Sequence, residues 1–307
     1  SHIHYLSAGE VVDIYTCYAW PNDAKASFNY AAEIWESLLD SAVPIEIDAC
    51  WTEMSGKALG GSYSNYVINS STFTFYQESL GNSLTASNIE PDDPDMTIVY
   101  NRLFDWYYGT DGNTIPGTID FASVVLHEIG HGLGFGGLMT VIGDNGYWGM
   151  GSDSYPAIYD RFTETGADTP LLNLGNGTAA LGSALTGGDL YFDGFEARNA
   201  NGGIRPKLYA PSTWAPGSSY SHLDYDTFND TENELMVWQI SDGESIHSPG
   251  PVALGLLEDL GWTITPTPTS GDYQRGSSKR GRAPRKPPNA RCARRRVSTC
   301  RRAATSA

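Results

Sequence analysis

The segment VVLHEIGHGLGFGG, residues 124–137, constrains the fold of this chain more than any other stretch. Its apolar spacing predicts a helix, on which His127 and His131 are four residues apart and share one face. Their Cβ atoms are then roughly 5–6 Å apart. The other face carries apolar residues such as Val125 and Ile129, which are expected to pack against the body of the protein. One face of this helix is therefore expected to be buried and the other to be open to a ligand.

Two imidazoles at this spacing suit a single Zn²⁺ ion, which binds His nitrogen at about 2.0–2.1 Å. Glu128 lies beside them and can accept a proton from a water activated by the metal without itself binding the metal. The alternative is a chance match on an ordinary buried helix, but the chain has only 6 His residues, so coincidence is the weaker explanation. The segment predicts a zinc site with His127 and His131 as ligands and Glu128 as general base.

A catalytic zinc ion needs a third protein ligand. The longer pattern H-E-x-x-H-x-x-G-x-x-H is matched through Gly134, but its last position is Gly137, which has no side chain to bind a metal. The remaining histidines are His2, His4, His222 and His247. The first two lie at an N-terminus that is expected to be frayed, so the spacing leaves the third ligand open between the last two.

Two further motifs connect the chain to a known family. The helix segment is followed by a long insertion, then by YSHLDYD at residues 220–226 and by NELM at residues 233–236. This order resembles the leishmanolysin-type zinc metallopeptidases, which are metzincin-like enzymes, and especially their secreted bacterial relatives. The resemblance covers about residues 24–262, since LGLLEDLGW at residues 254–262 is similar to the closing helix of that family.

The resemblance implies the site residues and the reaction. It implies His127, His131 and His222 as ligands of one catalytic Zn²⁺, and Met236 as the residue of a Met-turn beneath the metal. The implied activity is that of a secreted zinc-dependent endopeptidase, which cleaves a protein or peptide substrate by a zinc-activated water with Glu128 as general base. A tyrosine beside the third ligand, Tyr220 or Tyr225, is an open candidate for assisting the reaction. The competing hypothesis is a catalytically silent adhesin or binding module, against which the intact Glu128 argues.

The implied fold is α+β and metzincin-like, with two lobes around a cleft. The upper lobe, about residues 1–135, is expected to be mainly β with a backing helix and the active-site helix. The lower lobe, about residues 136–264, is expected to be loop-rich. An extended substrate is expected in the cleft, paired with an edge strand such as residues 97–101. A monomer is the expected oligomeric state.

Periodicity and turn residues predict the individual elements. The expected strands are residues 11–17, 44–51, 73–76 and 97–101, whereas residues 54–72 look like loops because Gly, Ser and Asn dominate them. The expected helices are residues 24–42, 120–133 with Asp120 as N-cap, 157–162, and 251–260 ended by Gly261.

Two features bear on export and on further metal ions. Cys17 and Cys50 each end a strand-like run, so a disulfide between neighbouring strands is preferred over two buried thiols, and this favours a secreted protein. The acidic turns at residues 92–95 and 144–153 have the carboxylates that calcium prefers but not EF-hand spacing, so solvated loops are the preferred interpretation.

The charge of the chain is divided unevenly. Residues 1–270 hold 7 basic and 35 acidic residues, which gives −28, whereas residues 271–307 hold 12 basic residues and 1 acidic residue, which gives +11. The acidic body disfavours nucleic acid and anionic membrane surfaces as partners. No apolar run approaches the ~20 residues that span a bilayer. The segment TPTPTS at residues 265–270 is typical of a linker, and the basic tail after it is expected to be disordered and a non-homologous extension of the domain.

Overall fold

The computed structural model describes residues 5–6, 10–11, 15–150, 154–265 and 295–296. The predicted linker lies outside these residues except for Thr265. The predicted basic tail lies outside them except for the two-residue strand β16 (Arg295–Arg296). His2 and His4 also lie outside the described residues.

The described part of the chain is α+β, as predicted. Its α-helices are α1 (Asn22–Leu38), α2 (Glu78–Thr85), α3 (Phe121–Gly132), α4 (Ala179–Leu185), α5 (Phe195–Ala200), α6 (Tyr225–Phe228) and α7 (Gly250–Leu260). Short 3₁₀ helices are η1 (Tyr159–Phe162), η2 (Leu171–Leu174) and η3 (Glu234–Met236). The strands are β1 (Tyr5–Leu6), β2 (Glu10–Val11), β3 (Leu39–Asp40), β4 (Ile47–Thr52), β5 (Gly60–Ser64), β6 (Tyr66–Asn69), β7 (Thr74–Gln77), β8 (Met96–Asn101), β9 (Trp106–Tyr107), β10 (Ile119–Asp120), β11 (Thr140–Ile142), β12 (Asn145–Tyr147), β13 (Thr163–Thr165), β14 (Leu190–Phe192), β15 (Thr263–Ile264) and β16.

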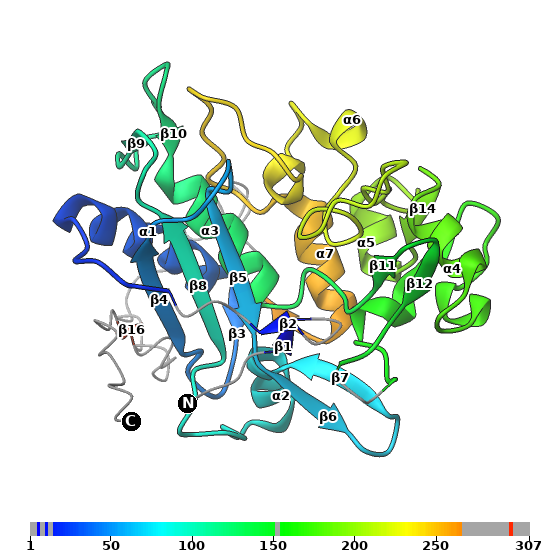
Figure 1. Cartoon of the computed structure of the whole chain (residues 1–307). Coiled ribbons are helices and arrows are strands. Elements are labelled where there is room, and N and C mark those ends of the chain that lie inside the picture. The colour runs from blue at the N-terminus through cyan, green and yellow to red at the C-terminus, as the bar shows by residue number, and fades with distance from the viewer. Residues whose placement is uncertain (1–4, 7–9, 12–14, 151–153, 266–294, 297–307) are drawn as a thin grey trace, which may run out of the picture.

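The main sheet has the strand order β16-β4-β8-β5. Strand β4 runs parallel to β8, and β5 runs antiparallel to β8 on its other side. Figure 1 shows α1 and α3 behind this sheet. The buried ring of Phe121, at the start of α3, packs against the buried rings of Trp51 on β4 and Tyr100 on β8. The prediction that residues 97–101 form an edge strand is wrong, because β5 covers that edge of β8. Among the described residues, β5 is the last strand at that end of the sheet.

The differences from the predicted elements have local causes. Strands β5 and β6 lie in the Gly-, Ser- and Asn-rich stretch that looked like loops. In β5, of sequence GGSYS, pairing with β8 outweighs weak strand propensity, whereas β6 begins with the strand formers Tyr, Val and Ile and pairs with β7. Helix α1 ends at Leu38 instead of residue 42, since Leu39 is extended and pairs with Ile264. The predicted strand at residues 11–17 is wrong for residues 15–17, which belong to no strand.

Helix α3 is held at both ends and along its buried side. Its N-cap is Asp120, as predicted, whose carboxylate accepts a hydrogen bond from Ser123 N at 2.8 Å. The indole Nε1 of Trp35, on α1, donates to Leu126 O at 2.9 Å, and that of Trp262 donates to Leu133 O at 2.7 Å. These contacts fix α3 against the body, so its remaining face has a defined direction.

Cys17 and Cys50 form a disulfide, as predicted, with their Cα atoms 5.2 Å apart. The bond ties the segment before α1 to β4, and Tyr18 N donates to Trp51 O at 2.7 Å in the same place. None of the helices in the described ranges is both long and apolar enough to cross a lipid bilayer.

Replacing both disulfide cysteines by serine is expected to lower the free energy of unfolding by about 2–4 kcal/mol. The bond joins residues 33 positions apart, so its loss releases chain entropy in the unfolded state. A denaturant titration of C17S/C50S beside the wild-type protein measures the difference. Equal midpoints for the two proteins under oxidising conditions would contradict this expectation.

Candidate metal centre

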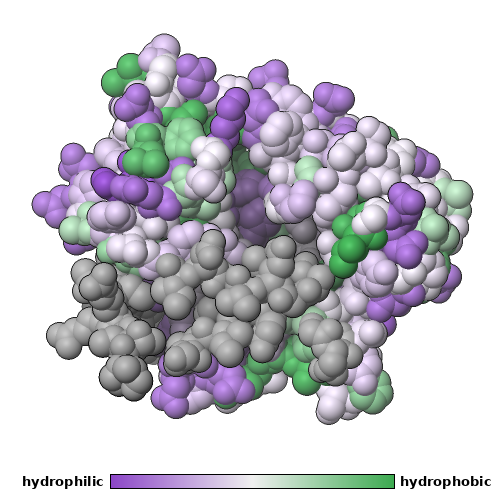
Figure 2. All heavy atoms as spheres, viewed as in Figure 1, coloured by the Kyte–Doolittle hydropathy of each residue, from purple (hydrophilic) through white to green (hydrophobic). Residues whose placement is uncertain are grey.

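A cleft of about 1700 Å³ is lined in part by β5. Residues from β5, α3, the segment after α3 and the segment after η3 line it, and His127, Glu128, His131 and His222 are among them. Figure 2 shows this face of the molecule hollowed, with hydrophilic residues deep inside. The cleft therefore brings the predicted site residues of α3 to a surface that a large ligand can reach.

Three histidines meet at the floor of the cleft. The Nε2 atom of His131 lies 3.0 Å from that of His127, and the Nε2 atom of His222 lies 3.1 Å from that of His127 and 3.2 Å from that of His131. Helix α3 supplies two of the rings through its i, i+4 spacing, and a loop far along the chain supplies the third. The structure thus brings together the three histidines that were expected to share a metal.

Backbone carbonyls fix the tautomer of each ring. The Nδ1 atoms of His127, His131 and His222 lie 2.6 Å from Leu235 O, 2.6 Å from Phe135 O and 2.8 Å from Ser218 O. A carbonyl oxygen only accepts hydrogen bonds, so each Nδ1 carries the proton and each Nε2 presents a lone pair. These carbonyls are functional groups that the sequence did not indicate, because main-chain partners leave no residue-type signal.

Burial keeps the rings neutral. Removal from water lowers the pKa of all three histidines, to about 3 for His131, where the neighbouring His127 lowers it further. Three neutral rings with converging lone pairs repel one another unless a cation lies between them. A tetrahedral ion that binds nitrogen at about 2.0–2.1 Å holds its ligand atoms roughly 3.3 Å apart, close to the observed spacing. The donor set therefore fits a Zn²⁺ ion, and imidazole ligands suit Cu and Ni ions as well.

Glu128 lies on α3 between the two helical histidines, and its side chain reaches the cleft although the residue is only 7% exposed. Burial raises its pKa to about 8. Strand β5 passes directly over it at Gly60, where an added Cβ would lie 3.1 Å from Glu128 Oε1 and 3.0 Å from Val99 O. Glycine at this position therefore leaves room for the carboxylate.

Met236 ends η3 and is fully buried beneath the histidines. Its Sδ atom would lie 2.9 Å from a Cβ at Gly130, so the sulfur packs against the backbone of α3 between its two histidines. The preceding residue, Leu235, supplies the carbonyl that orients His127.

The structure separates the other candidates from this centre. His247 Nε2 lies 2.8 Å from the buried carboxylate of Asp120, at the N-terminal end of α3. The hydroxyl of Tyr220 is fully engaged away from the histidines, with Asp160 at 2.6 Å and Thr163 at 3.1 Å. The ring of Tyr225 packs against Trp238, with centroids 6.0 Å apart.

The acidic turns do not form a second metal centre in the described ranges. Asp95 is buried and accepts hydrogen bonds from Glu46 N and Asn82 Nδ2, each at 2.6 Å, so the interpretation of its turn as a solvated loop is wrong at this residue. The other group of converging ligand atoms among the described residues consists of Asp230, Glu234 and Glu244, none of which is buried.

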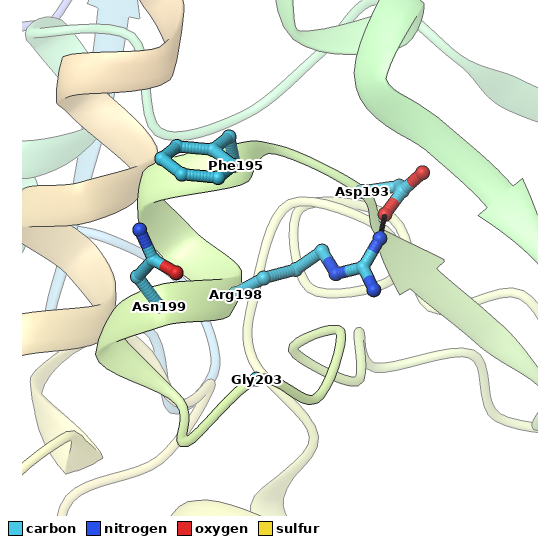
Figure 3. Close-up of a pocket in the computed structure, with 5 residues that line it drawn as sticks. All are labelled: Asp193, Phe195, Arg198, Asn199 and Gly203. Carbon is cyan, nitrogen blue, oxygen red and sulfur yellow. Dashed lines mark hydrogen bonds and ion pairs between the residues drawn. The ribbon is translucent and has the colours of Figure 1, made fainter.

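A smaller pocket of about 340 Å³ lies beside α5 (Figure 3). Asp193 and Arg198 form an ion pair of 2.9 Å at its wall, and Phe195 is 70% exposed beside them. The described residues that line it include no group of metal ligands.

Comparison with known proteins gives one similarity. A family model described as SPBPB7E8-like matches residues 21–152. This stretch contains His127, Glu128 and His131 but ends before His222. No curated protein and no solved structure matches the chain.

Proposed function

We propose that this chain is a secreted zinc-dependent endopeptidase of the leishmanolysin type, with a metzincin-like arrangement of an upper and a lower lobe around the cleft. The observation that carries the proposal is the convergence of three neutral histidines beside Glu128 at the floor of an open cleft. The disulfide supports export, since such bonds persist in oxidising compartments.

The side chains have distinct tasks in this reaction. His127, His131 and His222 would hold the metal, which when bound supplies Lewis acidity to the scissile carbonyl and to the attacking water. Glu128 takes the proton of that water and delivers it to the departing amine. A divalent cation held by the three histidines would offset the cost of burying the Glu128 charge and would keep the carboxylate ionised and able to accept the proton.

The edge strand β5 offers a place for the substrate. Among the described residues β5 pairs with β8 alone, and β5 lines the cleft over Glu128, so an extended peptide that added to the sheet at β5 would lie across the metal centre. This arrangement suits an endopeptidase, since a cleft of about 1700 Å³ has room for several residues of a peptide.

Substitution of Gly60 by alanine is expected to lower kcat about 10–100-fold while zinc remains bound, because the new Cβ displaces the carboxylate of Glu128. Gly61→Ala is the matched control, since its Cβ would lie 3.7 Å from the nearest atoms, an ordinary contact. Steady-state kinetics and metal analysis of both variants give the comparison. Equal losses in the two variants would show that clearance above Glu128 is not the cause.

Digestion of casein or gelatin by the purified full chain, with and without a metal chelator, tests the proposed activity. Cleavage that stops on chelation and returns with Zn²⁺ is the expected result. An adhesin or binding module with the same fold would bind zinc and leave the substrate intact, and this outcome would refute the enzyme proposal.

A further inference from the structure

Asp160 is a buried carboxylate outside the proposed metal centre. It lies in η1, is 1% exposed, and its oxygens accept hydrogen bonds instead of forming an ion pair. The donors are Leu138 N at 3.1 Å and Tyr220 OH at 2.6 Å to Oδ1, and Ala157 N at 2.8 Å to Oδ2. A carboxylate so buried is retained only with such partners, which makes these bonds strong and specific.

Two of these donors, Leu138 N and Tyr220 OH, belong to the two ends of the insertion that separates His131 from His222. The chain leaves the α3 region at Leu138 and returns at Tyr220, and the same oxygen of Asp160 accepts from both. Gly137 completes the contact, because a Cβ there would collide with Asp160 Oδ1. Asp160 thus occupies the space next to the position at which the longer histidine pattern would have placed its third ligand.

Tyr220 has a backbone conformation that needs support. Its φ of +74° is in the left-handed region, which a residue with a bulky side chain rarely adopts. Besides Asp160, Thr163 Oγ1 lies 3.1 Å from its hydroxyl, and the hydroxyl of Tyr159 donates to its carbonyl at 3.2 Å. This turn directs the following residues so that His222 faces α3, while Leu223 N is tied to Met236 O at 2.8 Å on the other side.

We propose that Asp160 and Tyr220 are a positioning pair that fixes the third histidine ligand against the active-site helix and thereby sets the affinity for the metal. The inference rests on the metal centre proposed above. Neither residue contacts the reacting atoms. Their role is to hold the two ends of the insertion together, so that His222 is already in place before the metal binds. Metal binding then does not have to offset the entropy lost in ordering His222.

Tyr220→Phe removes the hydroxyl and keeps the ring. We expect the dissociation constant for Zn²⁺, measured by competition with a chromophoric chelator on the full chain, to rise about 10–100-fold. The measurement is made at a temperature at which circular dichroism shows the metal-free variant folded. Tyr107→Phe is the matched control, because it removes another tyrosine–aspartate bond, of 2.7 Å to Asp111, outside the cleft.

Changes at Asp160 separate positioning from general stability. Asp160→Asn keeps an oxygen that accepts from Leu138 N and Tyr220 OH, although its amide nitrogen cannot accept from Ala157 N, and it is expected to retain more of the zinc affinity than Asp160→Ala. Asp160→Ala is expected to lose at least as much as Tyr220→Phe, and the double variant no more than the larger single loss, because both act through one bond. If Asp160→Ala does not fold, Tyr220→Phe and Asp160→Asn still decide the question.

The outcomes are distinct. A wild-type chain that binds no zinc would overturn both the metal centre and this pair. A wild-type chain that binds zinc, with Tyr220→Phe equal to it in affinity and only its thermal stability lowered, would overturn the positioning role and leave the metal centre intact.

Discussion

Glu128→Gln is expected to lower kcat for peptide cleavage about 10²–10⁴-fold and to leave one zinc ion bound. Glutamine has the shape of glutamate but cannot take a proton from the attacking water. The three converging Nε2 atoms belong to other residues, so the metal ligands are unchanged. Kinetics on a peptide substrate and metal analysis of the same sample provide both numbers.

The control for this variant is Glu53→Gln. Glu53 is exposed and pairs with Arg102 at 2.5 Å outside the cleft, so this variant is expected to be fully active. Full activity in Glu128→Gln would refute the assigned general base. Loss of zinc in that variant would indicate that the carboxylate supports the metal instead of the proton transfer.

His222→Ala is expected to lose most of its zinc and, with it, the activity. Removal of one of three ligand nitrogens is expected to weaken binding more than the 10–100-fold that follows from loss of a residue supporting a ligand. The remaining two histidines come from one helix and offer no third direction. Metal analysis after dialysis against a chelator measures the retained zinc.

His247→Ala is the matched histidine control. Its ring contacts Asp120 at 2.8 Å at the opposite end of α3, so its removal is expected to leave the bound zinc unchanged. If His247→Ala lost the zinc and His222→Ala retained it, the assignment of the third ligand would be wrong.

The strongly patterned elements could be predicted from the sequence. The period of residues 120–133 and the Asp120 cap correspond to α3, and Gly261 ends α7 with φ +122°. The predictions were poorest for segments that become strands only because they form hydrogen bonds with a strand distant in the sequence. Strand β5 has little strand propensity of its own, and its hydrogen bonds to β8 make it the last strand at that end of the main sheet among the described residues.

The candidate site likewise contains residues that the sequence could identify and groups that it could not. The i, i+4 spacing placed His127 and His131 on one face with Glu128 between them, because helix geometry is local. Leu235, Phe135 and Ser218 contribute carbonyls, which every residue has, so no sequence pattern could identify them. Gly60 was likewise one glycine among many until its position over Glu128 was known.

By itself, the sequence determined the histidine-bearing face of one helix, its cap, the pairing of Cys17 with Cys50 as the preferred interpretation, and the uneven distribution of charge. The resemblance implied His222 as the third histidine, but spacing left His222 and His247 open, and only the tertiary structure decided which of them lies beside His127 and His131. The physical reason is that the chain of a long insertion can return to α3 along many different paths. Its path is selected by long-range contacts, above all the buried bonds of Asp160 to Leu138 and Tyr220.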